Sequence, residues 1–214
     1  MKIPKLQFIT QESEQYTHLQ QVEFACKGGI EWVQLRVKDK PYEEWLDIAK
    51  ETKKICDKYD VTLIINDNVT IAREVYAHGV HLGQEDMHSD DARKILGNNF
   101  IVGVTANTFE QVKNHSDNGA DYIGLGPFRF TKTKLNLSPV IGLEGYKLIM
   151  EKCRKENIDV PIFAIGGIKS DDFADILNTG IYGIAISSLI VNSENIIDTT
   201  KNIVDDIYKF SVKK

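Results

Sequence analysis

The segment Phe128-Arg-Phe-Thr-Lys-Thr-Lys134 directly follows an apolar run, Asp121–Pro127, and places the hydroxyl groups of Thr131 and Thr133 beside the ammonium group of Lys134. The stretch before it contains Tyr122 to Leu125, which has the composition of a short buried strand. Phosphate oxygens accept many charge-assisted hydrogen bonds, and hydroxyl, backbone N–H and ammonium groups donate them. A solvated polar loop is the default interpretation of such a segment. The hypothesis of a phosphate site at Thr131, Thr133 and Lys134 therefore depends on what surrounds it.

Strand-like and helix-like segments alternate along the chain, and this pattern predicts how the polar segments are positioned. Eight strand candidates are present, each followed by a segment able to form a helix: Leu6–Thr10, Glu31–Leu35, Thr62–Ile65, Gly79–Leu82, Phe100–Val104, Tyr122–Leu125, Pro161–Ile165 and Gly183–Ile186. Several strands are apolar throughout, which is typical of a parallel sheet covered on both faces. We therefore predict an α/β fold, a (β/α)8 TIM barrel that forms one domain over residues 1–214.

The helix candidates complete this barrel. The clearest helix runs from Pro41 to Tyr59, with apolar side chains at three- and four-residue steps. Others are predicted over Phe109–Asp117, Leu143–Lys155, Asp171–Leu177 and Glu194–Phe210. Three glycines stand between a predicted helix and the next strand, where a left-handed residue commonly ends a helix: Gly79, Gly119 and Gly180.

Polar side chains follow the second predicted strand, at the barrel end where this fold carries its chemistry. The alternation in Gln34-Leu-Arg36-Val-Lys38 directs Gln34, Arg36 and Lys38 toward the barrel axis. Two inward cations are costly unless a negative ligand or partner meets them. This segment therefore predicts an anionic ligand.

Two carboxylates follow consecutive strands, Asp67 after Asn66 and Asp86 after the fourth strand. Two carboxylates together with phosphate oxygens are the usual surroundings of a protein-bound Mg²⁺. Either aspartate could instead cap a helix, Asp67 one that begins near Asn68 and Asp86 one that begins near Ser89. Both together, beside two inward cations, favour a metal–phosphate site.

A second anion site is predicted after the last two strands. Gly166-Gly167 follows strand seven and Ser187-Ser188 follows strand eight. Glycines leave backbone N–H groups open to a phosphate, and the loops after strands seven and eight of this fold frequently bind one. We expect this glycine-rich site to bind a monophosphate.

The bulk properties limit the classes of partner. The net charge of −5 gives no basic field for nucleic acid or an anionic membrane. No apolar run reaches the roughly 18 residues of a membrane span, and the N-terminus lacks a signal-peptide core. The scattered Cys26, Cys56 and Cys153 are typical of buried thiols in a reducing cytoplasm. We predict a cytoplasmic protein with small-molecule substrates; whether it forms a homo-oligomer stays open.

These motifs resemble, in order and over nearly the whole chain, those of the thiamine-phosphate synthase family. They are Gln34-Leu-Arg36-Val-Lys38, Ile64-Ile-Asn66-Asp67, Val80-His-Leu-Gly-Gln-Glu-Asp86, Asp121-Tyr-Ile-Gly-Leu-Gly-Pro127, Thr131-Lys-Thr-Lys134 and Ala164-Ile-Gly-Gly-Ile168. The resemblance implies a magnesium-dependent transferase that joins hydroxymethylpyrimidine diphosphate to a thiazole phosphate and releases pyrophosphate.

The resemblance also implies roles by position. Asp67 and Asp86 would bind Mg²⁺, and Gln34 would contact the pyrimidine. The diphosphate would be held by Arg36, Lys38, Asn66, Thr131, Thr133 and Lys134, of which Arg36, Lys38 and Lys134 would act in catalysis. The thiazole phosphate would be held by Gly166, Gly167, Ser187 and Ser188.

Three positions differ from the usual family pattern. Thr105 stands where relatives usually have Ser and would keep the hydroxyl that bonds to the pyrimidine side of the site. Asn107 stands where relatives commonly have His, which the related thiazole tautomerases use for proton transfer. Arg129 precedes the Thr-Lys segment in an unusual Phe128-Arg129-Phe130 sequence. The alternatives are a tautomerase-like isomerase and a non-catalytic paralogue that binds thiamine phosphate.

Overall fold

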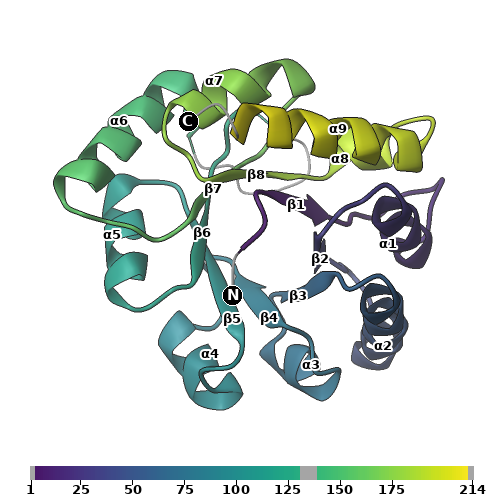
Figure 1. The fold of residues 1–214 in the computed structure, drawn as a ribbon. Coiled ribbons are helices and arrows are strands. Elements are labelled where there is room, and N and C mark those ends of the chain that lie inside the picture. Colours follow the sequence, from purple (N-terminus) through teal and green to yellow (C-terminus); the bar gives the residue numbers. More distant parts are fainter. Residues whose placement is uncertain (1–2, 131–138, 212–214) are drawn as a thin grey trace.

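The strands close into a barrel, as predicted. The structure, a computed structural model, describes residues 3–130 and 139–211. Eight parallel strands follow one another in sequence order around the barrel, and β1 pairs with β8 to close it (Figure 1). Their bounds are β1 (Leu6–Ile9), β2 (Trp32–Leu35), β3 (Thr62–Asn66), β4 (Gly79–Leu82), β5 (Ile101–Ala106), β6 (Tyr122–Leu125), β7 (Ile162–Ile165) and β8 (Gly183–Ile186).

Helices form a ring outside the strands (Figure 1). They are α1 (His18–Lys27), α2 (Tyr42–Lys58), α3 (Val69–Glu74), α4 (Ser89–Leu96), α5 (Phe109–Asp117), α6 (Gly142–Lys155), α7 (Phe173–Asn178), α8 (Ser188–Val191) and α9 (Ile196–Ser211). The helix predicted from Asp171 begins instead with one 3₁₀ turn, Ser170–Asp172. No helix within residues 3–130 and 139–211 is both long and apolar enough to span a bilayer.

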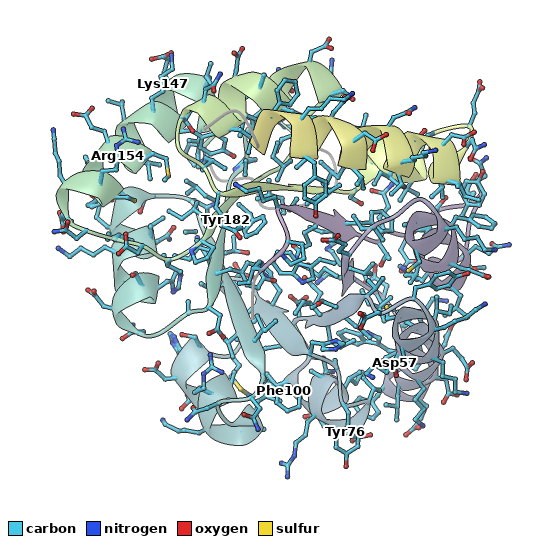
Figure 2. The ribbon with its side chains drawn as sticks, viewed as in Figure 1. Asp57, Tyr76, Phe100, Lys147, Arg154 and Tyr182 are labelled. Atoms are coloured by element: carbon cyan, nitrogen blue, oxygen red, sulfur yellow. The ribbon has the colours of Figure 1, made fainter. Side chains whose placement is uncertain are left out.

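Side chains from alternate strand positions fill the barrel interior. Trp32, Tyr122 and Phe163 are fully buried and pack edge to face, with the Trp32 ring centroid 4.7 Å from Tyr122 and 4.9 Å from Phe163. A Cβ atom at Gly103 would lie 2.1 Å from the Tyr122 ring, so glycine is required there. Figure 2 shows Tyr182, which packs against the Phe163 ring, near the middle of the ring of strands.

The three glycines predicted to end helices have two different roles. Gly119 and Gly180 have φ values of 72° and 102°, which confirms the left-handed conformation predicted there. Gly79 is the first residue of β4, and the cap prediction is wrong for it. A Cβ atom at Gly79 would lie 2.1 Å from the Ile101 carbonyl oxygen, so close approach of neighbouring strands is the reason for this glycine.

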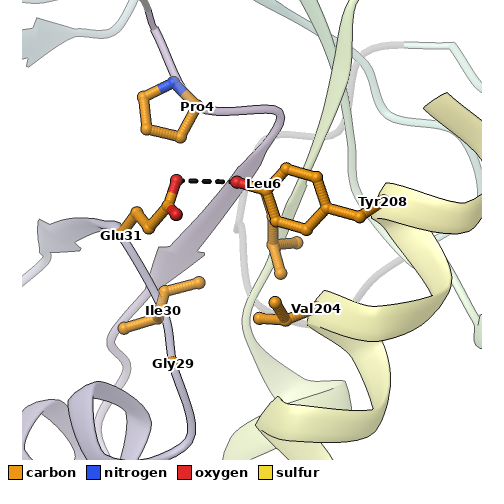
Figure 3. Close-up of a pocket in the computed structure, with 7 residues that line it drawn as sticks. All are labelled: Pro4, Leu6, Gly29, Ile30, Glu31, Val204 and Tyr208. Carbon is orange, nitrogen blue, oxygen red and sulfur yellow. Dashed lines mark hydrogen bonds between the residues drawn. The ribbon is translucent and has the colours of Figure 1, made fainter. Parts of the chain in front are cut away.

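A shallow hollow lies at the amino-terminal ends of the strands. Pro4, Leu6, Ile30 and parts of α9 line it, and the Tyr208 hydroxyl donates a 2.7 Å hydrogen bond to Glu31 Oε2 there (Figure 3). This hollow is at the barrel end opposite to the loops that carry the predicted site residues. The hollow lies between α9 and the segments that lead into β1 and β2.

Candidate active site

The carboxylates after β3 and β4 meet at the rim of the barrel, together with one of the predicted cations. Lys38 Nζ donates to Asp67 Oδ2 in an ion pair. Asp67 and Asp86 also lie close enough for each to shift the pKa of the other, and all three side chains are at least partly shielded from solvent. The structure therefore brings together Lys38, Asp67 and Asp86, three residues that sequence placed on separate loops.

The two carboxyl groups differ in pKa because of this contact. Burial raises the pKa of Asp86, and the hydrogen bond to Asp67 and its negative charge raise it further. Burial would also raise the pKa of Asp67, but hydrogen bonds from Asp86 and Lys38 and the charge of Lys38 bring it below its usual value. The negative charges of the two neighbouring carboxyl groups thus oppose each other, and a bound cation would relieve this repulsion.

Neither aspartate caps a helix, so the alternative roles considered from the sequence are wrong. Asn68 is the N-cap of α3, and its Oδ1 accepts a 2.9 Å hydrogen bond from the Ile71 amide. Asp86 Oδ2 instead accepts a 2.7 Å hydrogen bond from Gly83 N, which folds the loop after β4 back on itself. The position before α4 is held by His88.

The segment that carries Arg36 and Lys38 is fixed by residues at the end of β1. Thr10 Oγ1 accepts a 3.0 Å hydrogen bond from the Arg36 amide, and Glu12 Oε1 accepts one of 3.3 Å from the Lys38 amide. His18 bonds to both, at 3.0 Å to Thr10 Oγ1 and 2.9 Å to Glu12 Oε1. Burial lowers the pKa of the Arg36 guanidinium, opposed by the nearby charges of Asp67, Glu12 and Asp39. The Thr10–Glu12–His18 group was not predicted from the sequence.

A buried chain of hydrogen bonds crosses the barrel below these charges. Gln34 Nε2 donates to Gln7 Oε1 (3.1 Å), and Gln7 Nε2 donates to the Tyr122 hydroxyl (3.3 Å). His81 then joins the Tyr122 hydroxyl (Nδ1, 2.9 Å) to Thr105 Oγ1 (Nε2, 3.0 Å). The inward direction predicted for Gln34 is confirmed. The hydroxyl of Thr105 bonds to a histidine of the protein, and its predicted contact with the pyrimidine stays a prediction.

The glycines after β7 form a turn packed against the chain that leaves β6. Gly166 and Gly167 have φ values of 94° and 67°, a conformation that glycine adopts without strain. Arg129 N donates to Gly166 O (3.0 Å), and Arg129 Nη1 donates to Gly167 O (3.1 Å). Cβ atoms on the two glycines would lie 2.8 Å from Pro127 Cβ and 2.9 Å from Arg129 Cβ. Only glycine fits this turn.

The serines after β8 occupy the neighbouring part of the rim. Ser187 precedes α8, and its hydroxyl donates a 2.9 Å hydrogen bond to Gln11 Oε1. Ser188 is exposed and is the first residue of α8. Asn66, at the end of β3, is buried opposite His81 of β4. Thr131, Thr133 and Lys134, the sequence-predicted diphosphate ligands, lie outside the described residues.

Comparison with known proteins decides the family. The family profile described as thiamine monophosphate synthase matches residues 6–190. A thiamine-phosphate synthase of Bacteroides thetaiotaomicron is 46% identical over 200 residues, which cover 94% of this chain and 96% of the relative. The chain belongs to the thiamine monophosphate synthase family.

Further members and solved structures agree with this assignment to the thiamine monophosphate synthase family. A thiamine-phosphate synthase of Flavobacterium johnsoniae is 47% identical over 190 residues, covering 89% of this chain and 90% of the relative. A solved thiamine phosphate pyrophosphorylase from Pyrococcus furiosus has a TM-score of 0.84 at 32% identity and covers 96% of both chains. Orotidine 5'-phosphate decarboxylase from Pyrococcus horikoshii, at 13% identity and a TM-score of 0.66, shares the fold alone.

Asn107 has a bridging position in this member of the thiamine monophosphate synthase family. Its Nδ2 donates to the Gly126 carbonyl, and its Oδ1 accepts from Gln84 Nε2. Its backbone amide donates a 2.7 Å hydrogen bond to Gln111 Oε1. A carboxamide donates and accepts hydrogen bonds but does not exchange a proton as an imidazole does. The contacts of Asn107 therefore explain its presence without a tautomerase reaction.

Proposed function

We propose that this chain is a transferase that joins hydroxymethylpyrimidine diphosphate to a thiazole phosphate, yielding thiamine phosphate and pyrophosphate. The observation that carries the proposal is the cluster of Lys38, Asp67 and Asp86 at the carboxyl ends of β2, β3 and β4, with Arg36 beside it, in a chain of this family. Cations and paired carboxylates suit a diphosphate and its metal ion, and this is the barrel end that carries chemistry in the fold.

The reaction requires stabilisation of a leaving group more than it requires a base. The bond between the exocyclic methylene carbon and the diphosphate oxygen breaks, and its electron pair leaves with pyrophosphate. The thiazole nitrogen supplies the electron pair of the new bond to carbon, so no proton has to be removed. Arg36, Lys38 and Lys134 would stabilise the charge that develops on pyrophosphate, and such preplaced donors act mainly on the transition state.

A magnesium ion fits the donor set that the structure brings together. Carboxylate oxygens are hard ligands of the kind that Mg²⁺ prefers, and few protein ligands are needed when the substrate supplies others. Asp67 and Asp86 would hold this ion. When bound, Mg²⁺ would supply positive charge beside the diphosphate oxygens.

The remaining predicted residues would bind the two substrates around this centre. Gln34 and Asn66 would face the pyrimidine diphosphate, with Thr105 on the pyrimidine side. Gly166, Gly167, Ser187 and Ser188 would bind the phosphate of the thiazole. We also propose a cytoplasmic location, because the cysteines at 26, 56 and 153 are all free thiols buried in the structure.

The decisive experiment is turnover of both substrates at increasing Mg²⁺ concentration, with thiamine phosphate and pyrophosphate measured together. We expect equimolar products from the wild-type protein. Asp86→Asn should raise the Mg²⁺ concentration for half-maximal rate at least about tenfold, since even residues that only orient metal ligands have effects of that order. The amide oxygen of Asn still accepts from Gly83 N, so the loop after β4 should keep its shape.

Glu85→Gln is the matched control. It removes a carboxylate from the adjacent, exposed position without touching the contact with Asp67, so its Mg²⁺ requirement should equal that of the wild type. An Asp86→Asn variant with an unchanged requirement would leave Asp86 with only its structural role in the loop. Absence of thiamine phosphate from wild-type reactions would refute the proposed function itself.

A further inference from the structure

Arg129 joins two neighbouring loops at the barrel rim through both its backbone amide and its guanidinium group. Its backbone amide donates to Gly166 O at 3.0 Å, continuing the pairing of β6 with β7 beyond the ends of both strands. Its guanidinium then donates from Nη1 to Gly167 O at 3.1 Å. Arg129 therefore donates hydrogen bonds to both carbonyl oxygens of the glycine turn.

The guanidinium is itself held in place by a two-pronged ion pair. Arg129 Nη1 and Nη2 donate to the two carboxylate oxygens of Asp172, the latter at 2.6 Å. Asp172 Oδ2 also accepts a 2.8 Å hydrogen bond from the Lys169 amide, which fixes the carboxylate to the far end of the same turn. The Asp172 side chain is only 13% exposed, and hydrogen bonding to Arg129 lowers its pKa. Paired planar groups of this kind define orientation as well as charge.

These contacts determine which way the amide groups of the turn point. In a planar trans peptide, the C=O of one residue and the N–H of the next point in opposite directions. Because the carbonyls of Gly166 and Gly167 point to Arg129, the N–H groups of Gly167 and Ile168 point away from it. In the strand order β6-β7-β8, the side away from β6 is the side of β8, where Ser187 and Ser188 follow.

We propose that Arg129 is a positioning residue for the phosphate-bearing thiazole substrate, acting by holding the Gly166–Ile168 turn with its amide groups toward β8. This inference rests on the proposed function and adds a residue to it. Successive N–H groups in a turn of this kind form an anion-binding concavity. Arg129 itself does not reach the phosphate in this role, because its guanidinium is bound to Asp172 and to the back of the turn.

The test compares binding of the thiazole phosphate with binding of the same thiazole lacking its phosphate, measured by calorimetry without turnover. For Arg129→Ala we expect affinity for the thiazole phosphate to fall roughly tenfold or more, and affinity for the unphosphorylated thiazole to stay the same. Arg129→Lys keeps the charge but has no fork to hold Gly167 O and Asp172 at once, so it should fall between wild type and alanine. In turnover, the Michaelis constant for the thiazole phosphate should rise more than that for the pyrimidine diphosphate.

Arg93 provides a matched control at the other end of the barrel. It also combines an ion pair with an aspartate, at 2.6 Å to Asp121 Oδ2, with a hydrogen bond to a backbone carbonyl, that of Gly97 at 3.2 Å. Arg93→Ala should therefore lower the melting temperature as Arg129→Ala does, but leave thiazole phosphate affinity unchanged.

Equal losses of thiazole phosphate affinity in the Arg93 and Arg129 variants, or equal losses for both thiazole ligands in Arg129→Ala, would overturn the inference. If Arg129→Ala does not fold, Arg129→Lys decides the question by the same comparison. A wild-type protein without turnover would refute the proposed function, whereas an active wild type with unchanged Arg129 variants would refute only this inference.

Discussion

The hydroxyl of Thr105 bonds to His81 inside the barrel and is also predicted to contact the pyrimidine, so replacing this hydroxyl with a methyl group tests which of the two it serves. Thr105 is 8% exposed and His81 5% exposed, and their side chains are joined at 3.0 Å. Thr105→Val keeps the side-chain shape and removes this partner of His81 Nε2. A lost partner for a buried polar group costs about 1–3 kcal/mol in free energy of unfolding. For a domain of this size, that corresponds to a melting temperature lower by about 2–12 °C.

Thr105→Ser is the matched control, because it keeps the hydroxyl and removes a methyl group. The loss of one buried methyl group should cost about 0.8 kcal/mol. Urea unfolding followed by circular dichroism should therefore rank stability as wild type, then Ser, then Val. If Val is as stable as wild type while Ser is weaker, the methyl group and not the hydrogen bond matters, and the reasoning is refuted. If Val keeps full stability but raises the Michaelis constant for the pyrimidine diphosphate, the hydroxyl serves the substrate, as the sequence resemblance implies.

Two further changes address the rate and the packing of the barrel. Lys134→Ala should lower the single-turnover rate of thiamine phosphate formation by about 10²–10³ at saturating Mg²⁺, because it removes a donor to the departing pyrophosphate. Asn107→Ala should have a smaller effect in the same assay, and the reverse ranking of the two would contradict the synthase mechanism. Gly103→Ala should destabilise the protein by about 1–3 kcal/mol or more in urea unfolding, because its Cβ would lie 2.1 Å from the Tyr122 ring. An unchanged midpoint would show that the ring can move aside.

The fold was accessible from the sequence because it depends on local patterns. Apolar strands and helix periodicity recur along the whole chain, and parallel strands covered on both faces leave few possible architectures. Seven of the eight predicted strands agree with the observed ones or differ by one residue at one end, and the strand predicted over Phe100–Val104 begins one residue later and ends two residues later. The inward direction of Gln34 followed from the period of two along a strand. The same alternation applied to β1 would have placed Gln7 inward beside it.

Contacts between loops were harder to predict from the sequence, because they depend on distances between neighbouring strands and loops that residue spacing does not encode. Gly79 shows the limit clearly: its place between a helix and a strand suggested a cap, whereas the neighbouring strand requires it. The bond between His81 and Thr105 spans two strands, and the Arg129–Asp172 pair joins loops 43 residues apart. Arg129 was visible only as a departure from the usual family pattern, and its role needed the positions of Gly166 and Gly167.

The charges of the side chains at the rim are the reason for proposing both a metal ion and Lys134 as partners of the diphosphate. Arg36 and Lys38 carry two positive charges and the carboxylates of Asp67 and Asp86 two negative charges, so these four side chains leave no excess positive charge for an anionic ligand. A diphosphate brings several more negative charges into a chain whose net charge is already −5. No global field of the protein compensates for them. In the proposed function, additional positive charge would come from a bound cation and from Lys134, and Asp86→Asn and Lys134→Ala probe these two sources of charge separately.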